Sequence, residues 1–379
     1  MAKISREGGY IHISYDEEDI RKSQDICLRS NIAYEAVPVD LLFNEKRPEL
    51  SMEVRDEKGP TEVADIGKFP YNTCGKLIMQ FGSSASCGSA SLLKRPDILL
   101  TAAHCVYKSE KQSFPSSTTF YWRLKDQTVY QIESVTNIFI PVEYEQTGEL
   151  QYDYAICVLS NPVGDHRNVL DYTTQVSQQE VITIGYPSVS PYNGFKMYYT
   201  QNVVSTYEES GKKFLRVGNG LAYGGASGGP WVLGQKVAGV TSWGWEGHTD
   251  VLSPQFDKKF EDMYAQAVKK APLRSIKGFK LDNDWGWFVC HLHIQYEDKE
   301  YQRSGDIRIN GSGTTDLNNL KSVIPALSVV NIKVFVAGGT DKYGAEKFIF
   351  DPDASNGAYY KISGTTLCSD LKYKGLISL

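Results

Sequence analysis

The sequence predicts an all-β protein made of two β-rich parts, with one helix closing the first of them. Short apolar runs rich in β-branched and aromatic residues recur between turn residues from about residue 69 onward. Near residue 254 this series gives way to apolar residues at helical spacing, and strand-like runs resume after residue 284. Because the chain has 379 residues, its length also favours two or three compact units over one.

The first 60 residues are set apart from the rest by a polar run. Apolar alternation over 10–14 indicates a short strand, and residues 16–30 fit an amphipathic helix. Residues 44–60 are charged, poor in apolar side chains and end in a Gly-Pro pair, a composition typical of a linker or a processed segment. We therefore expect residues 1–60 to form an N-terminal extension or pro-segment.

A β domain followed by one helix is predicted for residues 61–272. Its strands are expected at 76–81, 89–93, 98–103, 118–123, 130–140, 154–159, 181–186, 195–206, 214–217, 231–232 and 236–242. Their length and spacing are typical of barrels and sandwiches. Between Pro254 and Pro272, helical spacing is kept by Phe256, Phe260, Met263, Tyr264 and Ala267. One helix should therefore pack on the β domain at its end.

The last part of the chain has a pattern of its own. Residues 273–283 are basic and contain glycine, which predicts a linker. Strand-like runs follow at 285–296, 306–310, 329–337, 347–350 and 359–362. We expect residues 284–379 to form a separate β-sandwich-like accessory domain, and the chain shows no internal repeat.

Charge and hydropathy exclude several functions. A net charge of −5 gives no basic field for a phosphate backbone, so we expect no nucleic-acid partner. No apolar run approaches the 18 or so residues of a membrane span, and residues 1–19 lack the apolar stretch of a signal peptide. The seven cysteines lack zinc spacing, and His291 and His293 share a strand face without a third ligand, so no metal is predicted.

Three segments together indicate nucleophilic catalysis. TAAHC at 101–105 contains His104, YDYAI at 152–156 contains Asp153, and GGASGGP at 224–230 surrounds Ser227 with glycines. A serine hydroxyl becomes a good nucleophile when an imidazole takes its proton, and the imidazole in turn needs a carboxylate to hold its tautomer. Asp153 is preferred over Asp97, Asp126 and Asp165 because it directly precedes a buried-strand pattern within the YDYAI segment.

The glycines around Ser227 fit an oxyanion hole. The backbone N–H groups of Gly225 and Ser227 would both have to point at the developing negative charge, which requires dihedral angles that side chains obstruct. The same pentapeptide fits the GxSxG elbow of α/β-hydrolases, with His248, His291 or His293 downstream. That alternative requires a helix directly after the serine, whereas Gly228, Gly229 and Pro230 are followed by a strand-like run.

The chain order His104, Asp153, Ser227 resembles that of chymotrypsin-like serine proteases over roughly residues 60–272, and most closely their glutamyl endopeptidase branch. Further support comes from KFPY at 68–71, GYP at 185–187 and YGG at 223–225. This resemblance implies a double β-barrel with a C-terminal helix. It also implies a disulfide between Cys87 and Cys105, which lie on either side of the histidine strand, while Cys290 and Cys368 could join within the last module.

The resemblance also assigns a substrate-binding region. Ser242, Trp243 and Gly244 resemble the strand that pairs with the substrate backbone and forms one wall of the specificity pocket. Leu221 and Ala222 would form another wall, Leu221 being apolar where trypsin has its aspartate. Thr241 replaces the histidine with which glutamate-specific members read their substrate, so a glutamate preference is not carried over. Asp250 falls near the opposite wall, where a carboxylate would favour Lys or Arg.

These observations predict a serine endopeptidase that acts on protein or peptide substrates and needs no cofactor. Ser227 would attack, His104 would move the proton, Asp153 would orient the imidazole, and Gly225 and Ser227 would stabilise the oxyanion. We expect a secreted or cell-surface protein made as a zymogen. The alternative is a catalytically inert relative that acts as a binding or adhesion factor, with a protein or glycan target on its C-terminal module.

Overall fold

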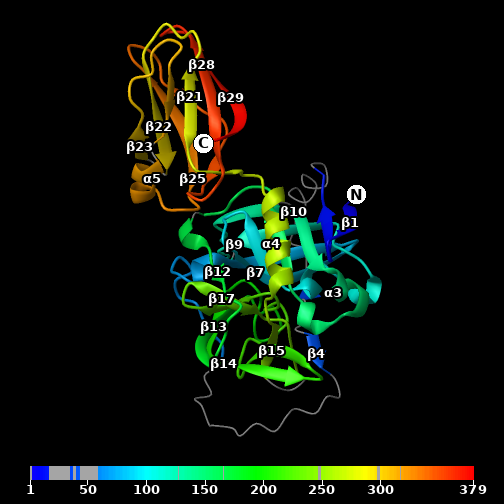
Figure 1. Cartoon of the computed structure of the whole chain (residues 1–379). Coiled ribbons are helices and arrows are strands. Elements are labelled where there is room, and N and C mark those ends of the chain that lie inside the picture. The colour runs from blue at the N-terminus through cyan, green and yellow to red at the C-terminus, as the bar shows by residue number, and fades with distance from the viewer. Residues whose placement is uncertain are drawn as a thin grey trace. The chain divides into compact units, whose positions relative to one another are not determined.

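The chain forms two compact units, Met1–Pro272 and Leu273–Leu379 (Figure 1). The structure, a computed structural model, describes residues 2–16, 35–36, 40–42, 59–126, 128–164, 166–245, 249–296, 299–315 and 317–379. The helix expected at 16–30 and nearly all of the charged run at 44–60 lie outside these ranges. Cys27, Asp165 and His248 also lie outside them.

The first sheet closes into a six-stranded barrel. Its strands are β6 (Cys74–Phe81), β7 (Ser84–Leu92), β8 (Ile98–Thr101), β9 (Ser117–Trp122), β10 (Gln131–Pro141) and β11 (Ala155–Leu159). The order β10-β11-β8-β7-β6-β9 is closed by pairing of β9 with β10. Alternate side chains such as Leu77, Met79 and Phe120 are fully buried inside it, as the period of two predicts.

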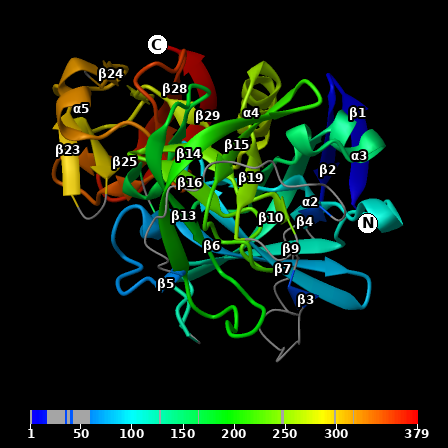
Figure 2. The ribbon, with the colours of Figure 1, turned by 90° about the horizontal axis from the view of Figure 1, so that it is seen from below.

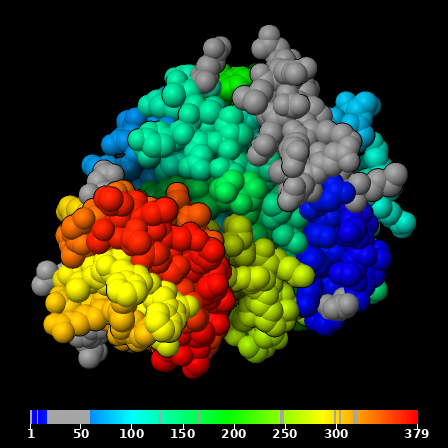
Figure 3. Space-filling model, turned by 90° about the horizontal axis from the view of Figure 1, so that it is seen from above, coloured from blue at the N-terminus to red at the C-terminus, as the bar shows by residue number. Residues whose placement is uncertain are grey.

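A hairpin from the N-terminal extension enlarges this sheet. Strands β1 (Lys3–Glu7) and β2 (Tyr10–Ser14) turn at Gly8 and Gly9, both of which have positive φ angles that glycine adopts without strain. β2 pairs antiparallel with β10 and buries Ile11 and Ile13 in the first barrel's core. The hairpin forms a continuous blue surface on one side of this unit (Figure 3). The start of the extension is therefore part of the folded domain.

The second sheet forms the other barrel. It contains β12 (Asp171–Tyr172), β13 (Gln179–Gly185), β14 (Tyr198–Glu209), β15 (Lys212–Val217), β16 (Pro230–Leu233), β17 (Lys236–Val240), β18 (Trp243–Trp245) and β19 (Val251–Pro254). Figure 2 shows β16, β13 and β14 side by side. Across the closing edge, the Val240 N–H donates to Ser253 Oγ at 2.8 Å. Three short strands from residues 35–62 join the sheets: β3 (Glu35–Ala36), β4 (Asp40–Leu42) and β5 (Thr61–Glu62).

Helix α4 (Lys258–Lys270) lies where the spacing predicted it, between Pro254 and Pro272. Its first turn is capped by Asp257, whose carboxylate accepts the Phe260 N–H at 3.1 Å. Phe260, with Met263 and Ala267, is buried in a core that α4 shares with both barrels. The other helical segments in the described part of the unit are α2 (Ala103–Val106) and α3 (Val142–Thr147), with 3-10 turns at Tyr71–Thr73, Ser109–Lys111, Leu150–Tyr152 and His166–Asn168.

The C-terminal unit is a β-sandwich with its own core. One sheet contains β20 (Ser275–Ile276), β27 (Phe348–Phe350), β25 (Val329–Val336), β22 (Cys290–Tyr296) and β23 (Lys299–Arg303), with β26 (Lys342–Tyr343) paired to β25. The other contains β24 (Ser312–Thr314), β21 (Phe279–Asn283), β28 (Asn356–Gly364) and β29 (Ser369–Ser378). Helix α5 (Leu317–Val323) completes the unit. The two barrels, the helix and this sandwich confirm the predicted fold class.

The prediction of a linker at 273–283 is wrong. These residues form β20 and β21, and Ile276, Phe279 and Leu281 are fully buried in the core of the C-terminal unit. In this stretch basic residues are interleaved with apolar ones, and Phe279 and Leu281 alternate as in a strand with one buried face.

Candidate active site

His104 and Asp153 lie at the same end of one strand pair. Thr101, at the end of β8, is in register with Ala155, at the start of β11, so the residues just beyond these two positions lie close together. His104 Nδ1 and Asp153 Oδ2 are 2.7 Å apart, and the His104 backbone N–H donates to Asp153 Oδ1 at 2.8 Å. Both side chains are buried. The two hydrogen bonds fix the position of the carboxylate relative to the imidazole.

Asp153 is held in its ionised form by its neighbours. Burial alone raises the pKa of this carboxyl, but the charge of His104 and hydrogen bonds from His104 and Ser242 outweigh it, and the resulting pKa lies below the ordinary value. The Ser242 hydroxyl donates to Asp153 Oδ2, the same oxygen that meets the imidazole. A buried, charged carboxylate beside an imidazole suits the stabilisation of an imidazolium.

Asp97, another candidate for the orienting carboxylate, is paired with an arginine instead of a histidine. Asp97 is fully buried and receives two hydrogen bonds from Arg95, one from Nε and one from Nη2, each 2.8 Å long. This paired, bidentate arrangement is typical of a structural ion pair. Asp126 lies in a turn, with a positive φ of 55° and its N–H bonded to the Phe195 carbonyl.

The loop around Ser227 has a backbone that only glycine allows. Gly225 has a φ of +92°, and a Cβ atom there would lie 2.6 Å from the Tyr186 carbonyl oxygen. Ser227 itself is fully buried, and its carbonyl accepts the Ser89 N–H at 2.8 Å. The loop is thus locked against the first barrel, which fixes the directions of its backbone N–H groups.

Ser89 is a site residue that the sequence reasoning missed. Its hydroxyl donates to the Gly225 carbonyl at 2.8 Å and accepts the Tyr186 N–H at 2.9 Å, so it ties the glycine loop to the segment after β13. The only signal was its place two residues after Cys87, in the strand before the histidine.

The residues assigned to substrate binding lie around β18. Trp243 and Gly244 pair with Leu252 and Val251 of β19 on one edge. Thr241 is fully buried, and its Oγ1 accepts the Trp231 indole N–H at 3.1 Å, so it helps hold β16. Leu221 and Ala222 follow Gly220, which lies against Val251 of β19 and whose N–H donates to the Thr249 carbonyl. The side chain of Leu221 is buried.

Asp250 differs from the expectation of a pocket carboxylate. It is buried and forms an ion pair with Arg216 of β15. Because the guanidinium already neutralises it, this carboxylate is not available to favour a Lys or Arg side chain of a substrate.

The predicted disulfide between Cys87 and Cys105 is absent, and both residues are buried thiols. The Cys87 thiol points toward Ser188 Oγ, 3.4 Å away, whereas Cys105 Sγ lies only 2.9 Å from where a Cβ on Gly88 would stand. Neighbouring residues of a strand face opposite sides. The two sulfurs therefore lie on opposite faces of β7. Cys290 and Cys368 are thiols as well, the first buried and the second exposed.

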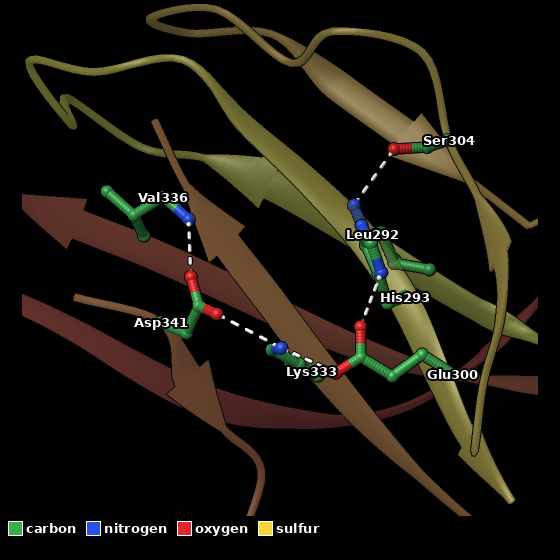
Figure 4. A network of polar contacts seen from close by, with 7 residues as sticks. All are labelled: Leu292, His293, Glu300, Ser304, Lys333, Val336 and Asp341. Atoms are coloured by element: carbon green, nitrogen blue, oxygen red, sulfur yellow. Dashed lines mark hydrogen bonds and ion pairs between the residues drawn. The ribbon is translucent and has the colours of Figure 1, made fainter. Parts of the chain in front are cut away.

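His291 and His293 each lie beside a carboxylate in the C-terminal sandwich. His293 Nδ1 lies 3.1 Å from Glu300, which also binds Lys333, and Lys333 in turn reaches Asp341 at 3.0 Å (Figure 4). His291 Nε2 lies 3.4 Å from Asp306. Within the described ranges no group of three or more potential metal ligands occurs.

Known proteins are similar to part of this chain. The sequence profile of the family described as Trypsin matches residues 62–268. A glutamyl endopeptidase of Bacillus licheniformis is 28% identical over 177 residues, which cover 45% of this chain. The chain spans about half the length of that relative, 51% of it.

Two solved structures are also similar to this chain. One, a Glu endopeptidase in complex with MPD, is 23% identical and covers 56% of this chain and 97% of its own, with a TM-score of 0.48. The other, the protease Anisep from Arthrobacter nicotinovorans, is 18% identical and covers 52% and 95%, with a TM-score of 0.45.

The two-barrel fold and the arrangement of His104 and Asp153 near the glycine loop define a protein of the trypsin-like serine protease class. Since the matched region exceeds half of the 379 residues, the chain belongs to the trypsin family. No helix in the described part of the chain is long and apolar enough to cross a membrane.

Proposed function

We propose that the first unit is a serine endopeptidase with Ser227 as nucleophile, His104 as proton carrier and Asp153 as the orienting carboxylate. The observation that carries this proposal is the buried network in which Asp153 receives hydrogen bonds from His104 Nδ1, the His104 N–H and the Ser242 hydroxyl. Such a network holds the imidazole with its Nε2 directed away from the carboxylate, as proton transfer from a serine requires.

The reaction follows from these roles. Ser227 Oγ attacks the peptide carbonyl and its proton passes to His104 Nε2, while the backbone N–H groups of Gly225 and Ser227 stabilise the oxyanion. The imidazolium then gives its proton to the leaving amine, which leaves an acyl group on Ser227. Water, deprotonated by His104, hydrolyses this acyl-enzyme and restores the serine.

Covalent labelling tests the nucleophile directly. A fluorophosphonate probe should label the full chain and a form trimmed to about residue 62 on Ser227, and Ser227→Ala should abolish the label. Label confined to the trimmed form would identify a zymogen. Ser355→Ala serves as a control, because it removes an exposed serine hydroxyl from the C-terminal unit and leaves the proposed triad intact. Absence of Ser227-dependent label in both forms would refute the proposal.

Cleavage preference and location belong to the same proposal. The relative's name suggests glutamate, but Thr241 is engaged with Trp231 and Asp250 with Arg216, so neither is placed to read a charged side chain. We propose a preference for uncharged side chains, since neither Thr241 nor Asp250 is available to bind a charge, and a secreted or cell-surface location. Profiling with a peptide library tests the first, and a preference for Glu, Lys or Arg would refute it. Ser227-dependent label confined to the cell interior of the source organism would refute the second.

For the C-terminal unit we propose glycan binding through two exposed tryptophans. Trp285 and Trp287 follow β21 and are 67% and 74% exposed. Trp285 has a φ of 60°, which is unusual for a bulky residue and is typical of functional sites. The loop is braced by buried Asn283, which bonds the Gly286 N–H and the Phe288 carbonyl. Rigid exposed rings of this kind suit stacking on sugar rings.

Charge argues against an anionic membrane or nucleic acid as the ligand of this loop. Residues 273–379 carry 13 Lys and Arg against 12 Asp and Glu, so the unit has almost no net charge. The test is sedimentation of the full chain with insoluble cellulose, chitin or peptidoglycan. Trp285→Ala with Trp287→Ala should abolish binding, and Tyr130→Ala, which removes a comparably exposed ring from the first unit, should not. Equal sedimentation of all three proteins would refute the proposal.

A further inference from the structure

The β13–β14 loop, which comprises residues 187–195, is tied to the start of the glycine loop. Its Ser188 N–H donates to the Gly224 carbonyl at 2.7 Å. Further along the same loop, the ring of Tyr192 meets that of Tyr223 edge-on, with centroids 4.9 Å apart. The β13–β14 loop therefore contacts two successive residues on the N-terminal side of the proposed oxyanion hole.

The bond from Ser188 determines where the Gly225 N–H points. The Gly224 carbonyl and the Gly225 N–H belong to one planar trans peptide, in which the C=O and the N–H point in opposite directions. Because the carbonyl is directed at Ser188, the N–H is directed away from it. A carbonyl held in this way keeps the N–H of its own peptide fixed, as a preorganised oxyanion donor requires.

The two proposed oxyanion donors are held in different ways. The Ala226 carbonyl, which shares a peptide with the Ser227 N–H, accepts the Gly229 N–H at 3.0 Å. This bond lies within the glycine loop itself. The Gly225 N–H is instead held from a separate segment of the chain, through Ser188. One of the two donors thus depends on the β13–β14 loop.

Ser188 is itself held in place by its surroundings. Its hydroxyl donates to the Tyr186 carbonyl at 2.9 Å. A Cβ atom on Gly194 would lie 2.3 Å from Ser188 Oγ, and one on Gly225 would lie 2.5 Å from it, so the side chain is packed between two glycines. Behind Gly194, the fully buried Lys76 of β6 donates from Nζ to the Gly194 carbonyl at 2.8 Å. The β13–β14 loop is therefore anchored on the side away from the glycine loop as well.

We infer that Ser188 is a positioning residue that directs the Gly225 N–H into the oxyanion hole. This inference rests on the proposed serine endopeptidase function and adds to it a residue that acts through Gly224. A peptide between two glycines rotates easily, because neither residue has a Cβ to restrict its dihedral angles. Without the bond from Ser188, the N–H can turn away from the reacting carbonyl. Loss of one oxyanion donor lowers kcat about 10²- to 10³-fold.

Two pairs of variants test this role. Ser188→Pro removes the N–H, whereas Ser188→Ala removes only the hydroxyl. Gly194→Ala brings a Cβ against Ser188 Oγ and displaces it, whereas Gly211→Ala, also at positive φ, has open space around it. The variants are compared with the wild type in whichever of the full-length and trimmed forms takes the fluorophosphonate label. The measurements are kcat and KM for labelled casein, the pH dependence of kcat, and the fraction of protein labelled at saturation.

We expect Ser188→Pro and Gly194→Ala to lower kcat about 100-fold with KM little changed. The pH dependence of kcat should stay that of the wild type, because His104 and Asp153 keep their contacts. The fraction labelled at saturation should also match the wild type, although labelling is slower. Ser188→Ala should lose far less activity than Ser188→Pro, and Gly211→Ala should match the wild type.

Equal kcat in Ser188→Pro and Ser188→Ala would overturn the inference and leave the endopeptidase proposal standing. So would a kcat that falls only in proportion to the labelled fraction, since that result shows a loss of folded protein. If Ser188→Pro does not fold, the comparison of Gly194→Ala with Gly211→Ala decides by the same criteria. Absence of Ser227-dependent label from both forms of the wild type would refute the endopeptidase, and this inference with it.

Discussion

A lysine buried behind the candidate active site makes the stability of the first unit depend on pH. Lys76 in β6 is fully buried, and its Nζ donates to the Gly194 carbonyl at 2.8 Å. Burial lowers the pKa of Lys76 to about 8, although Cys87 opposes the shift. Relative to the ordinary 10.5, the difference of 2.5 units corresponds to about 3.4 kcal/mol at 1.36 kcal/mol per unit.

The sign follows from counting protons. Between pH 8 and pH 10.5 the unfolded chain keeps the Lys76 proton and the folded chain has lost it, so the free energy of unfolding rises with pH in this window. Below pH 8 Lys76 is protonated in both the folded and the unfolded state, and the buried charge lowers the free energy of unfolding by the whole of about 3.4 kcal/mol. Lys76→Met removes the titration while keeping a similar volume. The free energy of unfolding of the wild type, relative to that of the variant, should therefore rise by about 3 kcal/mol between pH 8 and pH 10.5.

Urea unfolding of both proteins at half-unit steps from pH 7 to pH 10.5 measures this difference. Buried tyrosines such as Tyr154 and Tyr186, whose pKa values are raised by burial, titrate in both proteins and cancel in the comparison. The Met variant also leaves the Gly194 carbonyl without its donor, which shifts the whole curve but not its slope. A difference that stays constant over this range, or that falls with pH, would refute the reasoning.

Three further predictions concern the site and the thiols. Asp153→Asn should lower kcat about 10⁴-fold with KM for casein little changed, since the imidazole loses the carboxylate that sets its tautomer; wild-type kcat would contradict its assigned role. Gly225→Ala, whose Cβ would collide with the Tyr186 carbonyl, should lower the melting temperature and abolish fluorophosphonate labelling, whereas Gly211→Ala, also at positive φ but with open space around it, should keep the label. Dithiothreitol should leave the melting temperature unchanged, because Cys87 and Cys105 are already thiols; a fall of several degrees would show that they are bonded.

The sequence predicted correctly those elements whose structure depends on neighbouring residues in the chain. His104, Asp153 and Ser227 stand in short motifs next to buried strands, and strand register then brings His104 and Asp153 together. The helix at 258–270 was predictable for the same reason, since five apolar residues keep one face between two prolines.

Predictions that depended on the direction of a side chain, or on a partner distant in the sequence, were wrong. The spacing of Cys87 and Cys105 does not reveal that their sulfurs lie on opposite faces of β7. Asp250 is neutralised by Arg216, 34 residues away in the sequence. Strands as short as β3 and β4 carry no pattern of their own, because two or three residues become a strand only through the neighbour with which they pair.

The hairpin at the start of the chain determines what a cut in the charged run would produce. β2 makes five residue pairs with β10, and Ile11 and Ile13 are buried in the first barrel. Burial of two such side chains contributes about 3 to 6 kcal/mol, which corresponds to a dissociation constant between about 6 mM and about 40 μM for a severed N-terminal piece. The processed protein would therefore migrate as one species in gel filtration only at high protein concentration and would lose the N-terminal piece on dilution.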